Sequence, residues 1–460
     1  MTSSTTGTSD LPAARLAELR AAVAREMPGV RRDLEALVRI PSVSEEAFDQ
    51  AHVAASAHAV AELLRGAGMQ DVEVLDEGGA PAVVGRLPGP DGAPQVLLYA
   101  HHDVQPPGEE SDWTSAPFEP VEREGRLYGR GAADDKAGVM AHLAAIRAHD
   151  GQPPVGLTIF VEGEEESGSP SLGRILAAHR DKLAADVLVL ADSTNWKIGV
   201  PALTTSLRGL VEAYVEVRTL DHSVHSGMYG GAAIDAVTAM IRLLATLHDD
   251  AGNVAVQGLV SGEAAELDLT EEQLRADAGV LDGVQLIGEG SLTSRLWTKP
   301  ALTVVGFDAT STAKASNTLA AKAKAKISMR VAPGQDANEA YEILAEHLRS
   351  HAPWGVKVDV VVRETGQPFA ADVDGPAYDA ARAAFADAWG VQPVDMGIGG
   401  SIPFIADFAA LYPDAAILVT GVEDPDTRAH GADESLHLGE FERVCVAEAV
   451  LLERLGQLGS

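Results

Sequence analysis

Short, continuously apolar segments are the sequence feature that most constrains the fold of this chain. They read Ala82–Arg86, Val96–Ala100, Leu157–Val161, Val187–Ala191 and Ala416–Thr420. Strands without polar alternation are typical of a sheet that helices cover on both faces. Helical patterns lie between or after these strands, at Lys136–His149, Ser171–Ala178, Ala377–Trp389, Ile402–Tyr412 and Leu438–Leu455. This alternation predicts an α/β fold whose sheet is mixed but largely parallel.

Two helices are predicted before the first of these strands. Apolar residues at helical spacing predict the first over Ala14–Ile40 and the second over about Ala47–Gly66. Pro28 is expected to kink or split the first helix, and Pro41 is expected to end it.

A different pattern occupies the middle of the chain. Strand-like alternation and helical spacing follow one another as β (211–217), α (232–249), β (302–307), β (323–331), α (337–350) and β (357–363). This β-α-β-β-α-β order is that of a ferredoxin-like unit. We therefore predict an inserted domain at 207–366, between two parts of one catalytic α/β domain at 1–206 and 367–460.

Composition excludes several classes of partner. The chain has 460 residues and a formal net charge of −33, which disfavours binding to nucleic acid or to anionic lipid. No apolar run reaches the roughly 18 residues of a membrane span. The first ten residues lack the pattern of a signal peptide, and Cys445 is the only cysteine. These features predict a cytoplasmic protein without disulfides.

Imidazole and carboxylate side chains follow four of the apolar strands directly. These are His101–Asp103, Glu162–Glu166, Asp192, and a loop with Asp424, Asp426 and His430. A fifth group, Asp134–Asp135, opens a predicted helix. Ligands of open α/β sheets bind beyond the carboxyl ends of the strands, and so many acids gathered there require a positive charge. A metal cluster satisfies that requirement.

Each of these groups also has an ordinary interpretation. A run of glutamates is usually a solvated surface, a His-x-Asp triplet occurs in many loops, and an aspartate that opens a helix is usually a cap. The metal hypothesis is favoured because five such groups occur together, four of them at strand ends.

The same segments resemble the M20 metallopeptidases, especially the cytosolic dipeptidase and carnosinase branch. The matching segments are YAHHDVQP at 99–106, GRGAADDK at 129–136, EGEEESGS at 162–169, Ala191–Asp192, HSGMYGG at 225–231, Met329–Arg330 and GGSIP at 399–403. They follow the family's order over nearly the whole chain. The resemblance implies a catalytic domain that carries an inserted lid and dimerisation domain.

The resemblance also implies roles for single residues. His101 and Asp192 would bind one metal ion, Glu166 and His430 would bind another, and Asp134 would bridge the two. Asp103 would orient His101. Two zinc ions are the expected cofactor, with manganese or cobalt as alternatives.

Catalysis would then depend on Glu165. It would act as the general base toward a water that bridges the two metal ions, and would return the proton to the leaving amine. Release of an amine in this way is the hydrolysis of an amide bond.

Substrate contacts are expected from other segments. By resemblance, His225 would reach the active site of a partner subunit in a homodimer, where it would polarise the scissile carbonyl. Arg330 would bind a substrate carboxylate, together with the backbone of Gly400 and Ser401. Without the resemblance, His225 and Arg330 would be surface residues, and Gly400 and Ser401 an ordinary helix start.

Departures from the family pattern leave alternatives open. His102 stands where an apolar residue is usual, so that either histidine could bind metal, although the spacing to Asp103 favours His101. Glu364 stands where the animal dipeptidases have histidine, which alters the charge of the pocket. The predicted function is hydrolysis of dipeptides. The alternatives are an N-acyl-amino-acid deacylase and a non-catalytic binding protein on the same fold; retention of Glu165 disfavours the latter.

Overall fold

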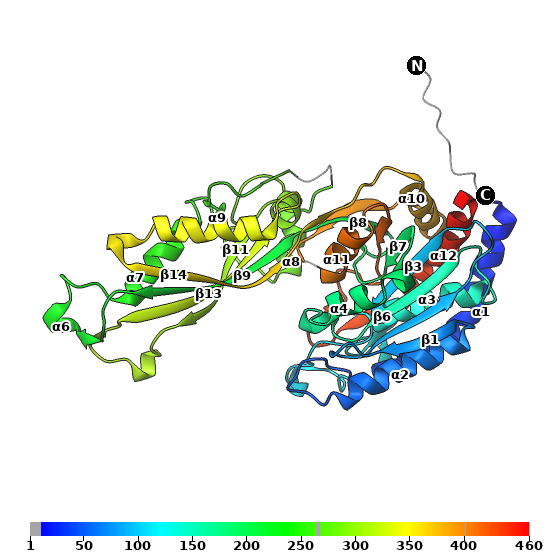
Figure 1. The fold of residues 1–460 in the computed structure, drawn as a ribbon, viewed down its shortest axis with the longest axis horizontal. Helices are drawn as coiled ribbons and strands as arrows, with labels where there is room; N and C mark the ends of the chain where they lie inside the picture. The colour runs from blue at the N-terminus through cyan, green and yellow to red at the C-terminus, as the bar shows by residue number, and fades with distance from the viewer. Residues whose placement is uncertain (1–10, 264–266, 401, 460) are drawn as a thin grey trace, which may run out of the picture. The chain divides into compact units, whose positions relative to one another are not determined.

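The computed structural model describes residues 11–263, 267–400 and 402–459. The chain divides into two compact units, which are coloured along the chain in Figure 1. One unit comprises the chain up to Thr205 together with Ala371–Met396 and the segment from Pro403 onward. The other, here called the inserted unit, comprises Ser206–Ala370 and Gly397–Ile402. Within the described ranges we find no helix with the length and hydropathy needed to span a bilayer.

The first unit is built on one twisted sheet. The strands of this sheet lie in the order β1 (Gln70–Leu75), β2 (Ala82–Leu87), β6 (Gly156–Glu162), β3 (Gln95–His101), β7 (Val187–Leu190), β17 (Ala416–Val419), β8 (Ala202–Leu207) and β15 (Phe369–Ala370), and β16 (Val394–Ile398) also pairs with β8. A smaller sheet joins β4 (Val121–Arg123), β5 (Arg126–Tyr128) and β18 (Ser435–His437).

The centre of the main sheet is parallel. Strands β6, β3, β7 and β17 pair in parallel, whereas β1, β2 and β8 are antiparallel to their neighbours. The four parallel strands are the ones that the sequence shows ending in imidazole or carboxylate side chains. Because they run the same way, their carboxyl ends lie at one edge of the sheet, which confirms the predicted α/β class.

Helices cover both faces of this sheet (Figure 1). On one face α3 (Lys136–Ala148) packs against β3, α1 (Ala13–Val38) and α12 (Leu438–Gly456), and α10 (Pro376–Trp389) packs against α12. On the other face Phe404 of α11 (Pro403–Leu411) stacks on Tyr99 of β3, with ring centroids 4.0 Å apart. The remaining helices are α2 (Ala51–Gly66), α4 (Leu172–Ala178) and α5 (Arg180–Leu183).

Helix α1 runs through Pro28 as one element, so the expected split does not occur. A proline inside a helix costs about 3 kcal/mol through the lost hydrogen bond and steric conflict. Val23 and Val30, on either side of Pro28, are fully buried, as is Leu34. Apolar burial on both sides of the proline exceeds that cost and keeps the helix continuous.

The inserted unit is an antiparallel sheet with two helices on one face. Its strands lie in the order β11 (Ala301–Asp308), β13 (Lys322–Val331), β9 (Gly209–Arg218) and β14 (Lys357–Gly366). Helices α7 (Ala236–Leu244) and α9 (Ala337–Ser350) follow β9 and β13 and cover alternate residues such as Val211 and Val215. This is the predicted ferredoxin-like order. The unit also contains β10 (Val224–His225), α6 (Ser226–Tyr229), α8 (Glu271–Asp277), β12 (Thr318–Leu319) and β15 (Phe369–Ala370).

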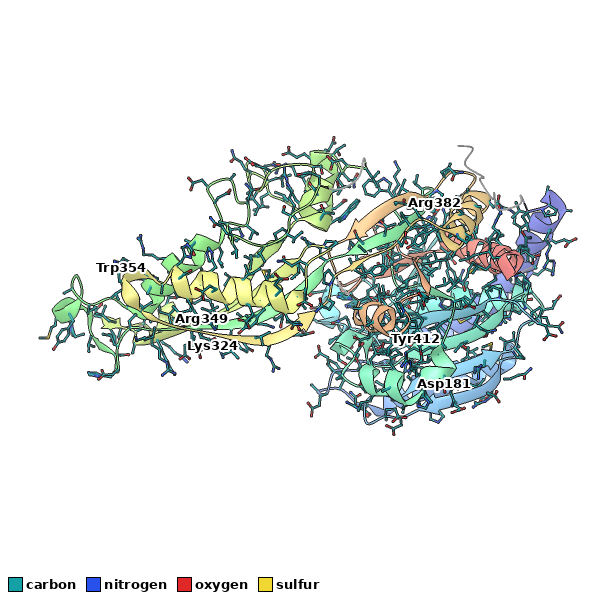
Figure 2. The ribbon with its side chains drawn as sticks, turned by 45° about the horizontal axis from the view of Figure 1, so that its top comes forward. Asp181, Lys324, Arg349, Trp354, Arg382 and Tyr412 are labelled. Carbon is teal, nitrogen blue, oxygen red and sulfur yellow. The ribbon has the colours of Figure 1, made fainter. Side chains whose placement is uncertain are left out.

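The opposite face of this second sheet is polar and carries no helix of the ferredoxin-like pattern. Lys324, labelled in Figure 2, belongs to β13. Its Nζ lies over the ring of Tyr214 on β9, 3.8 Å from the ring centroid. Lys326 forms an ion pair with Glu212 at 2.6 Å. Arg330 belongs to the same alternation, because it pairs with Leu210 two positions from Glu212.

A buried ion pair lies beneath the central strand of the first unit. His142 on α3 lies 2.6 Å from Glu448 on α12 and 2.9 Å from the carbonyl oxygen of Tyr99. Burial alone would lower the pKa of His142, but the Glu448 carboxylate raises it above the ordinary 6.5. The pair therefore stabilises the fold fully below pH 6.5 and loses this contribution as the pH rises through the folded pKa.

We expect Glu448→Gln to destabilise the protein in a pH-dependent way. At pH 6 the variant leaves a buried imidazolium unpaired, at a cost of about 3 kcal/mol. As the pH rises toward 9 the imidazole loses its proton, and the loss of stability becomes smaller. Urea unfolding of both proteins at the two pH values measures the difference. An equal loss at pH 6 and pH 9 would contradict a charged pair.

Candidate metal centre and active site

His101 is the last residue of β3 and faces two carboxylates. Its Nε2 lies 3.1 Å from Oδ1 of Asp134 and 3.9 Å from Oδ2 of Asp192. Asp134 comes from the loop before α3, and Asp192 follows the end of β7. The side chain of His101 is buried, so that its ring is fixed at this edge of the sheet. One imidazole and two carboxylates thus form a first donor group.

The second oxygen of Asp134 faces a second donor group. Its Oδ2 lies 3.1 Å from Nε2 of His430, and the same nitrogen lies 3.3 Å from Oε2 of Glu166. In each group the ligand atoms lie within 4.8 Å of one another. Asp134 belongs to both groups and presents one oxygen to each imidazole. Two cations held by these groups would therefore share Asp134.

The charges of the two groups require compensation. Hydrogen bonds that His430 donates to the carboxylates of Asp134 and Glu166 raise the pKa of His430 to about 11. Burial raises the pKa of Glu166 to about 7 and that of Asp192 to about 6. Positive charge on the imidazoles balances the negative charge of the carboxylates in these two groups. Divalent cations bound there would supply the positive charge instead. Nitrogen and carboxylate oxygen donors suit zinc, manganese or cobalt, so the residues fit two such ions.

Asp103 contacts a residue of each donor group, His101 and Glu166. Its Oδ1 lies 3.4 Å from Nδ1 of His101, on the ring edge opposite Asp134. Its two oxygens also accept hydrogen bonds from the backbone N–H groups of Glu165, at 3.2 Å, and Glu166, at 3.1 Å. Asp103 therefore contacts both the ring of His101 and the turn that carries Glu165 and Glu166, and it is placed to orient the two.

His102 points away from the carboxylates. Its Nε2 lies 2.9 Å from the carbonyl oxygen of Pro81, and burial lowers its pKa to about 4. Of the two adjacent histidines, the structure therefore brings only His101 into the donor groups.

Glu165 stands beside the donor groups without belonging to either. It begins a short 3₁₀ turn, Glu165–Ser167, that follows β6. Burial raises the pKa of its carboxyl well above the ordinary value, and the charge of Asp192 raises it further. A carboxyl with a raised pKa next to a metal site is suited to accept and return a proton.

A model of peptidase family M20/M25/M40 matches residues 97–454 of this chain. The chain belongs to this family. Among curated proteins, the cysteinylglycine-S-conjugate dipeptidase of Corynebacterium striatum is 39% identical to this M20 chain over 385 residues, which are 82% of the chain and 85% of the relative. The beta-Ala-His dipeptidase of Rattus norvegicus is 28% identical over 78% of the chain and 76% of the relative.

Solved structures share the fold of this M20 chain. The di-peptidase Dug1p from Saccharomyces cerevisiae superposes with a TM-score of 0.82 at 24% identity, over 96% of the chain and 98% of that structure. Human carnosine dipeptidase 1 superposes with a TM-score of 0.81 at 23% identity, over 97% and 100%. The chain is therefore an M20 metallopeptidase, and the deacylase and non-catalytic alternatives are not favoured.

Two residues near the donor groups were not predicted from the sequence. Gln105 donates from its side chain to Oε2 of Glu166 at 2.8 Å and from its backbone N–H to Oε1 at 3.1 Å. Glu434 is fully buried and accepts hydrogen bonds from the backbone N–H groups of Gly131, Ala133 and Asp134 at 3.1 to 3.2 Å. Gln105 lies within the YAHHDVQP motif, which is the one signal that could have indicated it.

Arg130 connects Glu434 to the loop that carries His430. It donates to Glu434 at 2.6 Å and to the carbonyl oxygen of His430 at 3.0 Å. His430 itself has a φ of 63°, a left-handed conformation that is unusual for a residue with a side chain. The Arg130–Glu434 pair thus holds the loops of Asp134 and His430 in one arrangement.

The expected substrate residues all belong to the inserted unit, apart from Ser401, which lies outside the described residues. His225 is exposed, and its Nδ1 accepts a hydrogen bond from the N–H of Gly227 at 3.0 Å. Arg330 lies on β13, and Gly400 comes shortly before α11. Glu364 pairs with Glu212 across β14 and β9, on the polar face of that sheet. The roles of these residues stay predictions.

Proposed function

We propose that this M20 peptidase hydrolyses the amide bond of dipeptides with two divalent cations at the site of Asp134. The observation that carries the proposal is the position of Asp134, whose two oxygens each lie 3.1 Å from an imidazole of a different donor group. His101 and Asp192 would hold one cation, and Glu166 and His430 the other. Zinc is the proposed ion, with manganese and cobalt as the alternatives that the same donors accept.

A side chain of the protein transfers the proton. When bound, the cations supply Lewis acidity and lower the pKa of a water molecule. Glu165 accepts the proton of the attacking water and then donates it to the nitrogen of the leaving amine. Asp103 keeps the backbone of Glu165 in place during both transfers. His225 is proposed to polarise the scissile carbonyl across a homodimer.

Cysteinylglycine is the proposed first substrate to test. The relative with 39% identity is named for cysteinylglycine S-conjugates, and other relatives are named for Cys-Gly or for beta-Ala-His. We expect the holoenzyme to release free glycine from Cys-Gly and from its S-conjugates, and to turn over N-acetylated amino acids at least about 100-fold more slowly. Amino-acid analysis of a panel of both substrate classes measures this.

Removal of the metal provides the control for this panel. Dialysis against a chelator is expected to abolish turnover, and zinc, manganese or cobalt added singly should restore it to different extents. Turnover of N-acyl amino acids alone would support a deacylase instead. Metal binding with no turnover of either class would contradict an enzyme.

We also propose that the protein acts in the cytoplasm as a homodimer that pairs through the inserted unit. The strand β11 is an edge of its sheet and exposes Val304, Val305 and Phe307 at 43, 53 and 39%. An exposed apolar edge strand is suited to pair with a second copy. Light scattering is expected to give twice the chain mass, and Val305→Lys to shift it toward the monomer. A monomeric wild type at micromolar concentration would contradict the dimer.

A further inference from the structure

Two histidines lie one helical turn apart at the end of α9, in the inserted unit. His347 belongs to the last turn of the helix, and His351 is the residue that follows its end. Their rings stack with centroids 4.0 Å apart and an angle of 18° between the ring planes. Arg349, which lies between them in the sequence, marks this end of α9 in Figure 2. His351 is exposed and His347 is half-buried, so the pair lies at the surface.

A hydrogen bond of His351 determines which of its ring nitrogens keeps a lone pair. Its Nδ1 lies 2.8 Å from the carbonyl oxygen of His347. A carbonyl oxygen can only accept a hydrogen bond, so Nδ1 carries the hydrogen of the neutral ring. The lone pair is then on Nε2, which is the nitrogen that can bind a cation.

A second hydrogen bond does the same for His347. Its Nε2 lies 3.1 Å from Oγ1 of Thr246, just after α7. The hydroxyl of Thr246 donates its single hydrogen to the carbonyl oxygen of Leu243 at 2.7 Å, so it accepts from Nε2 of His347. The lone pair of His347 is therefore on Nδ1. Histidines that bind metal usually donate their other ring N–H to an acceptor in this way, which fixes the orientation of the ring.

The surroundings of the two rings favour a bound cation over protonated imidazoles. Burial lowers the pKa of His347 below the ordinary 6.5, and the charge of His351 lowers it further. His347 is therefore neutral at pH 7, which is the form that binds metal. The backbone carbonyl groups at the C-terminal end of α9 also carry a partial negative charge, and this charge attracts cations.

We propose that His347 and His351 form a zinc site on the surface of the inserted unit. Nδ1 of His347 and Nε2 of His351 would be its two protein ligands, and water would complete the coordination. Two histidines four positions apart on one helix are a known arrangement for binding zinc. Two nitrogens on one tetrahedral zinc ion lie about 3.3 Å apart, close to the separation of the stacked rings. The site shares no residue with the donor groups of Asp134, so the inference does not depend on the proposed function.

Calorimetry with zinc chloride tests this site in the holoenzyme. The protein is first saturated with zinc and is then freed of loosely bound metal by gel filtration. We expect the wild type to bind one further zinc ion per chain with a Kd on the order of 10 µM, because two of the four ligands of a structural zinc site are present. His347→Asn and His351→Asn should each weaken this binding at least about 10-fold, because each removes one of the two ligands.

His58 on α2 provides a matched control. It is exposed, and its Nδ1 lies 2.7 Å from the carbonyl oxygen of Ala54, four positions earlier, just as Nδ1 of His351 faces His347. The residue at that earlier position is an alanine, so His58 has no second imidazole there. His58→Asn should therefore leave the binding of the further zinc ion unchanged.

A variant with altered spacing separates the pair from the number of histidines. Combining His351→Ala with Ala352→His keeps two histidines but places them five positions apart, where they no longer share a helix face. This variant should bind zinc as weakly as His351→Asn. Full affinity in the variant would overturn the proposal, because binding would then not depend on the pair.

NMR of protein labelled with nitrogen-15 in its histidines identifies the ligand atoms. Zinc should shift the signals of Nδ1 of His347 and Nε2 of His351 and leave those of His58 unchanged. Shifts on only one of the two rings would overturn the proposal. A wild type that binds no further zinc below about 1 mM would overturn it as well, as would less than about a twofold loss of affinity in both single variants.

Discussion

Glu165→Gln is expected to keep both metal ions and to lower kcat by roughly 10³-fold, the effect typical of losing a general base. The carboxylate of Glu165 lies outside both donor groups, so its replacement removes no ligand. Its backbone N–H still donates to Asp103, so the turn keeps its position. Metal content by mass spectrometry of the native protein and initial rates on Cys-Gly measure the two effects.

The neighbouring Glu166 provides a matched control. Glu166→Gln changes the same carboxyl one position along the same turn, but it removes a donor from the second group. We expect this variant to lose metal as well as activity, and to regain some activity at high metal concentration. Near-normal turnover by Glu165→Gln, or metal loss equal to that of Glu166→Gln, would contradict the role of general base.

Glu434→Gln is expected to destabilise the protein by about 3–5 kcal/mol, because it leaves a buried guanidinium unpaired. Arg130 is 1% exposed, and Glu434 is the acid with which it forms an ion pair at 2.6 Å. The change should also lower metal affinity about 10- to 100-fold, since the loop of Asp134 loses its support. Urea unfolding of the metal-free protein and metal titration of the native protein measure these effects separately.

Asp433→Asn is the control for this prediction. Asp433 precedes Glu434 but bonds to Thr114 near the surface, and its φ of 58° is one that asparagine tolerates. It should change stability by less than about 1 kcal/mol. The double variant Arg130→Met and Glu434→Gln should recover part of the loss, because it removes the unpaired charge. No recovery would show that the ion pair is not the cause.

The positions of the predicted donor residues follow from patterns within short segments. Four apolar strands each end in a histidine or an acid, and parallel strands bring such ends to one edge of a sheet. The strand pattern predicts that these ends lie together; the grouping of His101 with Asp192 and of Glu166 with His430 was implied by the resemblance to the M20 metallopeptidases, and the structure brings the same residues together. That these residues bind metal, and that Glu165 acts as a base, stay predictions. The variants of Glu165 and Glu166 described above test them.

Supporting residues could not be predicted in this way. In the sequence Glu434 is one more acid after His430, and Gln105 is one residue of the YAHHDVQP motif. The roles of these residues depend on burial and on partners that are distant in the sequence. Arg130, for example, is 304 positions from Glu434. The split expected at Pro28 was wrong for a related reason, because packing against α3 and α12 outweighs a local preference.

The hydrogen bonds from Arg130 to Glu434 and to the carbonyl oxygen of His430 have a consequence for synthesis of the protein. Arg130 is made about 300 residues before its partners, so these contacts form only after the chain has been made beyond Glu434. The segment Ser206–Ala370, which forms most of the inserted unit, is made before that point and can fold first. A nascent chain that stops before His430 therefore lacks one residue of the second donor group, so we expect the proposed hydrolytic activity to arise only after His430 and Glu434 have been made.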